Sequence, residues 1–162
     1  MKTLLIAINS KYIHSNLGIY YLQAYADKYK DNIKVLEYTI NQYQEDILQS
    51  IYLEKPDLIS ISCYIWNIEM VSSLCREFRK VLPNTKIWLG GPEVTYESKK
   101  YLLNHPEVDG IMLGEGEETF LEILDYYNKK EDSISLESIK SITYRKSAEK
   151  EFTYEGYNNF ND

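Results

Sequence analysis

The chain has 162 residues, the length of one domain, and carries a formal net charge of −7. Apolar residues make up 44% and charged residues 27% of the sequence, which excludes disordered, collagen-like and disulfide-scaffold classes. Nine acidic residues and two lysines lie between positions 93 and 125, so the negative charge is concentrated in one segment. An acidic chain without a basic stripe is not expected to bind nucleic acid.

The hydrophobic runs and the cysteines bear on where the protein works. No run approaches the roughly 18 apolar residues that a membrane helix needs. The apolar run at residues 1–8 is too short for the core of a signal peptide. Cys63 and Cys75 lack the spacing of a metal site. We therefore expect a cytoplasmic protein with reduced thiols and no membrane span.

Short apolar segments alternate along the chain with segments of helical periodicity. In chain order the pattern predicts strand 2–8, helix 15–30, strand 33–38, helix 42–54, strand 57–63, helix 66–82, strand 86–89, helix 96–104, strand 109–113 and helix 117–129. Two further strands, 141–145 and 151–154, are predicted to form a small hairpin.

Five alternating β-α units with wholly apolar strands indicate an α/β fold, in which a parallel sheet is covered by helices on both faces. The natural arrangement is a flavodoxin-like (Rossmann-like) three-layer sandwich, with a five-stranded parallel sheet of order 2-1-3-4-5 and a C-terminal β-hairpin. We expect one domain over residues 1–135, followed by the hairpin and a linker over residues 136–162.

In such a fold, ligands bind outside the carboxyl ends of the strands. The loops 9–15, 62–67, 90–95 and 114–119 would face this edge, and they are rich in Gly, Ser, Asn, Trp, Tyr and His. The candidate binding residues are Asn9, Ser10, Tyr12, His14, Ser62, Cys63, Tyr64, Trp66, Asn67, Gly90, Gly91, Pro92, Glu93, Gly114, Glu115, Gly116 and Glu117.

Several of these residues also have a purely structural interpretation. Gly90 and Gly91 let a ligand approach the backbone, or they form an ordinary strand-to-helix turn. Glu117 contacts a ligand, or it places favourable charge in the first turn of a helix. Trp66 stacks on a flat ligand, or it anchors the start of a helix. Cys63 is not expected to be a nucleophile, because the sequence places no base beside it.

Four runs of sequence together resemble a known family. They are KYIHSNLGIYYL (11–22), SCYIWN (62–67), LGGPEVT (89–95) and LGEGEETF (113–120). They resemble the N-terminal cobalamin (B12)-binding domain of B12-dependent radical SAM proteins, relatives of which are called Fe-S oxidoreductases or anaerobic magnesium-protoporphyrin IX monomethyl ester cyclase-like proteins. The resemblance covers residues 1–145, and it rests mainly on the last two runs in their order and spacing.

The resemblance implies a cobalamin-binding module that holds B12 at the carboxyl ends of the strands, with the nucleotide tail threaded into the sheet. Gly90 and Gly91 match the paired glycines that let the tail pass, and Ser62 matches the serine of the loop after the third strand. Residues 114–117 match the turn beside the tail. The loop after the first strand, which holds Tyr12 and His14, would lie under the corrin.

Two departures from related patterns limit what the resemblance implies. The Asp-x-His-x-x-Gly pattern of methionine synthase-like domains is absent, because Tyr12 replaces the Asp and three residues separate His14 from Gly18. We therefore expect no cobalt ligand at His14. With no second His nearby and no Cys cluster, we also expect no protein-built metal site. With only two cysteines, the chain lacks Cys-x3-Cys-x2-Cys. S-adenosylmethionine and a 4Fe-4S cluster would belong to a C-terminal radical SAM domain of the same polypeptide, beyond Asp162.

The sequence leaves two other functions open. One is a flavodoxin-like electron carrier that binds flavin mononucleotide, although the loop 9–16 is a weak match to a Ser/Thr-rich phosphate loop. The other is a degenerate B12 domain that binds no cofactor and serves only as a docking module. A phosphorylated receiver domain is disfavoured, because Ser62 and Cys63 stand where its aspartate is needed. We do not expect this chain alone to be catalytic.

Overall fold

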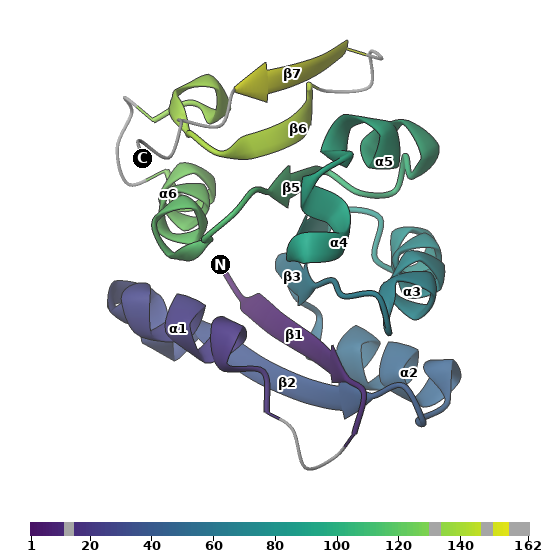
Figure 1. The fold of residues 1–162 in the computed structure, drawn as a ribbon. Helices are drawn as coiled ribbons and strands as arrows, with labels where there is room; N and C mark the ends of the chain where they lie inside the picture. Colours follow the sequence, from purple (N-terminus) through teal and green to yellow (C-terminus); the bar gives the residue numbers. More distant parts are fainter. Residues whose placement is uncertain (12–14, 130–133, 147–150, 156–162) are drawn as a thin grey trace.

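The computed structural model describes residues 1–11, 15–129 and 134–146, and the backbone of residues 151–155. Seven strands form one sheet of order β2-β1-β3-β4-β5-β6-β7 (Figure 1). The strands are β1 (Thr3–Asn9), β2 (Ile33–Thr39), β3 (Leu58–Ser62), β4 (Lys86–Gly90), β5 (Gly110–Met112), β6 (Ile142–Lys146) and β7 (Glu151–Glu155). The first five strands pair in parallel, which confirms the predicted order 2-1-3-4-5.

The predicted hairpin extends the sheet. Strand β6 pairs antiparallel with β5, and β7 pairs antiparallel with β6, so the sheet is wider than the five parallel strands alone. Strand β5 has three residues, and its outer side would otherwise leave backbone N–H and C=O groups unpaired. A buried hydrogen bond between the hydroxyls of Ser98 and Thr143, 2.8 Å apart, joins β6 to the helical layer.

Helices cover both faces of the sheet, as predicted for a three-layer sandwich (Figure 1). One face is covered by α1 (Leu17–Tyr25) and α6 (Glu117–Asn128); the other is covered by α2 (Gln44–Glu54), α3 (Ile68–Val81), α4 (Pro92–Thr95) and α5 (Ser98–Asn104). Short 3₁₀ segments add η1 (Asp27–Asn32) and η2 (Leu136–Ser138). Within the described parts of the chain, every helix is too short or too polar to cross a membrane.

Strand β1 shows how the sequence places the core. All seven of its residues are buried, and their side chains alternate between the two faces of the sheet. Leu4, Ile6 and Ile8 pack with α2 and α3, whereas Leu5 and Ala7 pack with α1 and α6. Each fully buried Leu or Ile stabilises the fold by about 1.5–3 kcal/mol, so a continuous apolar run is the expected sequence of a central strand.

Two predicted helices differ from the structure at their ends. The helix predicted at 15–30 ends at Tyr25, and the chain continues as the 3₁₀ segment η1. This tighter turn buries Tyr29. The hydroxyl of Tyr29 donates a hydrogen bond of 2.5 Å to Oδ1 of Asp125 in α6. The helix predicted at 96–104 is preceded by the additional short helix α4, which starts at Pro92 in the first helical turn.

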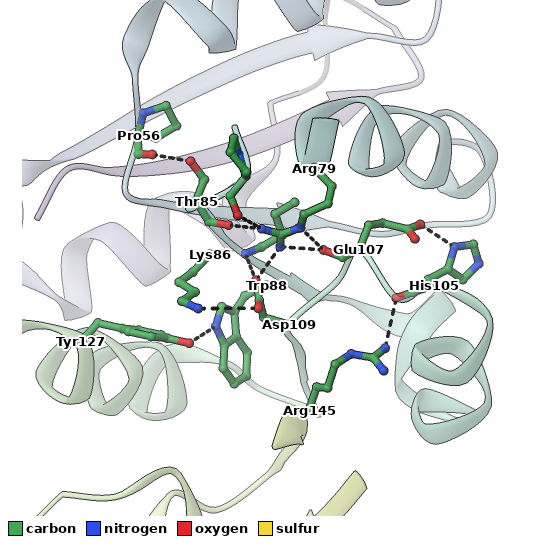
Figure 2. A network of polar contacts seen from close by, with 12 residues as sticks. Pro56, Arg79, Thr85, Lys86, Trp88, His105, Glu107, Asp109, Tyr127 and Arg145 are labelled. Carbon is green, nitrogen blue, oxygen red and sulfur yellow. Dashed lines mark hydrogen bonds and ion pairs between the residues drawn. The ribbon is translucent and has the colours of Figure 1, made fainter. Parts of the chain in front are cut away.

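Arg79 of α3 joins the loops that lead into strands β4 and β5 (Figure 2). Its guanidinium donates to the carbonyl oxygens of Pro83 (2.8 Å), Thr85 (3.0 Å) and Glu107 (2.8 Å). It also pairs with the carboxylate of Asp109 at 2.9 Å. One side chain thus satisfies the backbone acceptors of two loops, a strong arrangement because charged donors make the better hydrogen bonds.

We predict that Arg79→Met lowers the free energy of unfolding by about 2 kcal/mol, because several carbonyl groups and Asp109 lose their charged partner. Urea denaturation followed by circular dichroism measures this change. Arg76→Met on the exposed side of the same helix is the matched control, with an expected change below about 0.5 kcal/mol. Equal effects of the two substitutions would contradict the role given to Arg79.

Candidate functional site

Two adjoining hollows lie at the carboxyl edge of the sheet. The first, which we call the inner pocket, has a volume of about 190 Å³ and lies on the face covered by α1 and α6. It is lined by Asn16, Gly18, Ile19, Leu22, Ser60, Ile61, Ser62, Tyr64, Gly90, Gly91, Met112, Gly114, Glu115, Gly116 and Glu117. Eight of the candidate residues from the sequence are therefore brought together here, from three different loops.

The second hollow, the outer groove, has a volume of about 460 Å³ and is more open to solvent. It is lined by Asn9, Ser10, Ser15, Asn16, Leu17, Gly18, Tyr64 and Trp66. Asn16, Gly18 and Tyr64 line both hollows, so the outer groove leads directly into the inner pocket. The site thus has a narrow part beside the sheet and a wider part above the end of β1.

Strand β3 forms the back wall of the inner pocket. Ser60 and Ser62 are two residues apart, so both side chains lie on the face covered by α1 and α6. Ser60 is only 3% exposed, and the hydroxyl of Ser62 accepts a hydrogen bond of 2.8 Å from Asn16 Nδ2. The sequence pattern indicates Ser62 as a binding residue but not Ser60. The available signal was a serine inside an apolar strand, in phase with Ser62.

Apolar side chains line a further part of the inner pocket. Ile19 and Leu22 come from α1, and Met112 comes from the end of β5. A Cβ atom on Gly116 would lie 3.3 Å from Leu22 Cδ2, so the 114–117 turn packs tightly against α1. Sequence reasoning missed this wall, because the periodicity of 15–30 predicts a helix without indicating which of its residues faces the strand ends.

The two glycines after β4 have different roles. Gly91 has a φ of 103°, and a Cβ atom there would lie 2.5 Å from the carbonyl oxygen of Cys63. The turn therefore requires glycine for conformation and for close backbone packing. Gly90 is in β4, and a Cβ atom on it would meet Met112 Cε at 3.5 Å, an ordinary contact. The fold thus requires a glycine at position 91, whereas the glycine at position 90 leaves space in the inner pocket.

The loop after β3 carries a stacked aromatic pair. The rings of Tyr64 and Trp66 are parallel within 3°, with centroids 4.5 Å apart. Trp66 Nε1 donates to the carbonyl of Ile8 at 3.3 Å, and the residue remains 45% exposed. Trp66 therefore both anchors its loop to β1 and offers an aromatic surface to the groove, so the two interpretations of this residue are compatible.

Asn67 is buried and supports this loop without lining either hollow. Its amide nitrogen donates hydrogen bonds of 3.0 Å to the carbonyls of both Ile8 and Ser62. Its Oδ1 accepts from the backbone N–H of Tyr64. Cys63 is also fully buried, and burial raises the pKa of its thiol well above the usual range. The thiol stays protonated, so Cys63 is not an activated nucleophile.

The other candidates are placed as follows. Pro92 and Glu93 begin α4 and do not appear among the described residues that line the two hollows. Asn9 and Ser10 line the outer groove. Tyr12 and His14 lie outside the described residues. Within residues 1–11, 15–129 and 134–146, no three His, Cys, Asp or Glu side chains gather closely enough to hold a metal ion.

Comparison with known proteins shows similarity in both sequence and fold. A sequence model described as "B12 binding domain" matches residues 3–124. The chain is 34% identical over 70 residues to the cobalamin-dependent radical SAM methyltransferase TokK of Streptomyces tokunonensis, covering 43% of this chain and 10% of that protein. It is 26% identical over 148 residues to the cytidylyl-2-hydroxyethylphosphonate methyltransferase of Streptomyces wedmorensis, covering 80% of this chain and 27% of that protein.

The fold also has a close match among solved structures. The cobalamin-dependent S-adenosylmethionine radical enzyme OxsB, solved with aqua-cobalamin and S-adenosylmethionine bound, superposes with a TM-score of 0.76 at 17% identity. The match covers 98% of this chain and 22% of OxsB. The chain therefore spans between a tenth and about a quarter of the length of these larger proteins.

We predict that alanine substitutions separate the roles of the two glycines. Gly91→Ala is expected to lower the free energy of unfolding by about 2 kcal/mol or more, because the methyl group meets the Cys63 carbonyl and the positive φ is strained. Gly90→Ala, the matched control, should change it by less than about 0.5 kcal/mol. Urea denaturation measures both values. A tolerated Gly91→Ala would contradict the packing described for this turn.

Proposed function

Because this chain belongs to the B12-binding domain family, we propose that it holds cobalamin at the carboxyl edge of its sheet, with the nucleotide tail in the inner pocket and the corrin ring over the outer groove. The observation that carries this proposal is the two-part shape of the site. A narrow pocket that opens into a wider groove suits a cofactor made of a flat base, a linker and a large macrocycle.

The size of the inner pocket supports this division. At about 190 Å³ it is smaller than the roughly 300–1,000 Å³ of a typical ligand pocket, so it accommodates only part of a large cofactor. The apolar side chains of Ile19, Leu22 and Met112 suit the faces of an aromatic base. The hydroxyls of Ser60 and Ser62 supply polar groups at the back wall, where a ring nitrogen could accept a hydrogen bond.

The outer groove offers a different surface. The Tyr64–Trp66 stack forms one side, and Asn9, Ser10 and Asn16 contribute polar groups. A corrin has an apolar macrocycle fringed with amides, and both kinds of surface are available here. In this proposal the chain binds and orients the cofactor, and bound cobalamin supplies the reactive cobalt centre.

Flavin mononucleotide fits this edge less well. Its phosphate monoester carries close to two negative charges and would lie at the strand ends, where Glu115 and Glu117 line the inner pocket. The phosphodiester of cobalamin carries one charge, which the cobalt–corrin centre offsets within the molecule. The acidic turn therefore favours cobalamin over flavin mononucleotide. The alternative of a docking module without a cofactor is decided by the titration below.

For the whole protein we propose a B12-dependent radical SAM enzyme. Its relatives TokK and the phosphonate methyltransferase are methyltransferases, and this chain spans only a small part of their length. A radical SAM domain of the same polypeptide would hold S-adenosylmethionine and the 4Fe-4S cluster, because Cys63 and Cys75 are both buried here and offer no cluster ligands. Two free thiols are compatible with a reducing compartment, and we place the protein in the cytoplasm.

We predict that the purified domain retains about one equivalent of hydroxocobalamin after desalting. The absorbance spectrum of the retained cofactor measures both the amount and whether the benzimidazole has left cobalt, which a tail inside the inner pocket requires. Parallel titration with flavin mononucleotide should give no retained flavin. Retention of flavin alone would support the electron-carrier alternative, and retention of neither would support the docking module.

We also predict that Gly90→Val weakens cobalamin binding at least tenfold. Position 90 has ordinary strand geometry and space for a Cβ, so valine fits the backbone while its methyl groups enter the inner pocket. Binding of cobinamide, a corrinoid without the nucleotide tail, should change less than twofold, as measured by absorbance titration. An equal loss for both corrinoids would place the tail outside the inner pocket.

A further inference from the structure

Helix α1 forms one wall of the inner pocket, but its own sequence gives it little helical stability. It has nine residues, one of which, Ile19, is buried, and its second residue is Gly18. Its N-cap residue, Asn16, makes no side-chain capping hydrogen bond, and the first turn contains no acidic residue. A helix this short is marginal in isolation, and glycine lowers its propensity further. Yet α1 and its N-cap supply Asn16, Gly18, Ile19 and Leu22 to the inner pocket.

A single carboxylate from the neighbouring edge strand holds the start of this helix. Glu37 of β2 lies opposite Ala7 of β1 in the sheet register. Its Oε2 accepts from Asn9 Nδ2 at 2.7 Å and from the backbone N–H of Asn16 at 3.4 Å. Its Oε1 accepts from the hydroxyl of Tyr20 at 2.5 Å. Glu37 thus joins the end of β1, the N-cap of α1 and the first full turn of α1.

The charge on Glu37 suits this place. Negative charge near the N-terminus of a helix is stabilising, and the first turn of α1 provides none of its own. The hydrogen bond to Glu37 raises the pKa of Tyr20, so that this hydroxyl remains a donor at all physiological pH values. Hydrogen bonds to an ionised acceptor are roughly twice as strong as neutral ones. These contacts therefore fix α1 against the sheet more firmly than neutral partners would.

Asn16 connects Glu37 to the inner pocket, because it contacts Glu37 and also lines the pocket. An N-cap asparagine commonly uses its side chain to cap its own helix. Here Glu37 accepts from the backbone N–H of Asn16, and the side chain of Asn16 instead donates to Ser62 Oγ at 2.8 Å. Asn16 and Ser62 both line the inner pocket, whereas Glu37 is not among the described residues that line either hollow.

We infer that Glu37 is a positioning residue, which fixes α1 as a wall of the inner pocket and thereby sets the affinity of the domain for the nucleotide tail of cobalamin. The inference rests on the proposed function, and it assigns a role to a residue that need not touch the cofactor. It follows that loss of the carboxylate weakens recognition of the tail more than recognition of the corrin ring, which Glu37 affects only through Asn9 and Asn16 at the outer groove.

The chain offers a matched control at the other end of the segment formed by α1 and η1. Asp125 of α6 accepts from the hydroxyl of Tyr29 at 2.5 Å and pairs with Lys28 at 2.6 Å, both in η1. It is also a carboxylate that anchors this segment through a tyrosine, but it lies outside the residues described as lining the two hollows. Substitution of Asp125 therefore removes a contact that anchors this segment at a place that does not line the pocket.

The test compares Glu37→Gln with Asp125→Asn. For each variant, absorbance titration gives the dissociation constants of cobalamin and of cobinamide, and thermal denaturation gives the melting temperature. For Glu37→Gln we expect cobalamin to bind about tenfold more weakly and cobinamide at most about threefold more weakly, because Glu37 also contacts Asn9 in the outer groove. For Asp125→Asn we expect a lower melting temperature and unchanged affinity for both corrinoids. Tyr20→Phe, which removes one of the three contacts, should lower cobalamin affinity less than Glu37→Gln.

The possible outcomes separate this inference from the proposed function. If the wild-type domain binds no cobalamin, the proposed function fails and the inference fails with it. If the wild type binds and Glu37→Gln leaves both affinities unchanged, or lowers both equally, then the positioning role alone is wrong. If Glu37→Gln does not fold, the ratio of cobalamin to cobinamide affinity in Tyr20→Phe decides, and an unchanged ratio overturns the inference.

Discussion

The backbone of Gly91 lies against the backbone of Cys63, and the shape of the site depends on this contact. The N–H of Cys63 donates to the carbonyl of Gly90 at 2.7 Å, which continues the pairing of β3 and β4 past the last strand residues. A side chain at position 91 would come within 2.5 Å of the Cys63 carbonyl. The absence of a Cβ at Gly91 therefore brings the loop after β3 next to the turn after β4, and both loops then face the same site.

The two edges of the sheet use their polar groups in opposite ways. At the edge where β4 and β5 begin, Arg79 fills the space between loops and satisfies their carbonyl oxygens (Figure 2). At the carboxyl edge, the corresponding space is left as the inner pocket, which is lined by glycines, serines, apolar side chains and the polar side chains of Asn16, Glu115 and Glu117. Arg79 thus fills one edge with hydrogen bonds, and the other edge leaves space for a ligand at the carboxyl ends of the parallel strands.

Much of this arrangement could be predicted from the sequence. The alternation of apolar strands and amphipathic helices predicts the order 2-1-3-4-5, and this order places loops 62–67, 90–95 and 114–119 at one edge. Eight of the predicted residues then line the inner pocket together. The family resemblance, carried by the LGGPEVT and LGEGEETF runs, agrees with the match of the B12 binding domain to residues 3–124.

Other features depend on tertiary contacts that local patterns do not contain. Strand β6 joins the sheet by pairing with the three residues of β5, and the Ser98–Thr143 hydrogen bond links it to α5. Ser60 resembles any small residue in a buried strand, and it becomes part of the pocket only because α1 packs on the same face of the sheet. The role of Glu37 arises because β2 lies beside β1, which joins residues 28 positions apart. The predictions for Tyr12 and His14 remain predictions.

A crystal structure of the domain grown with hydroxocobalamin would decide where the cofactor lies. We expect the corrin ring over the outer groove beside Trp66, and the nucleotide base in the inner pocket between α1 and the 114–117 turn, in contact with Ser60 or Ser62. A structure in which the base remains on cobalt, with the inner pocket free of the cofactor, would contradict the proposed function.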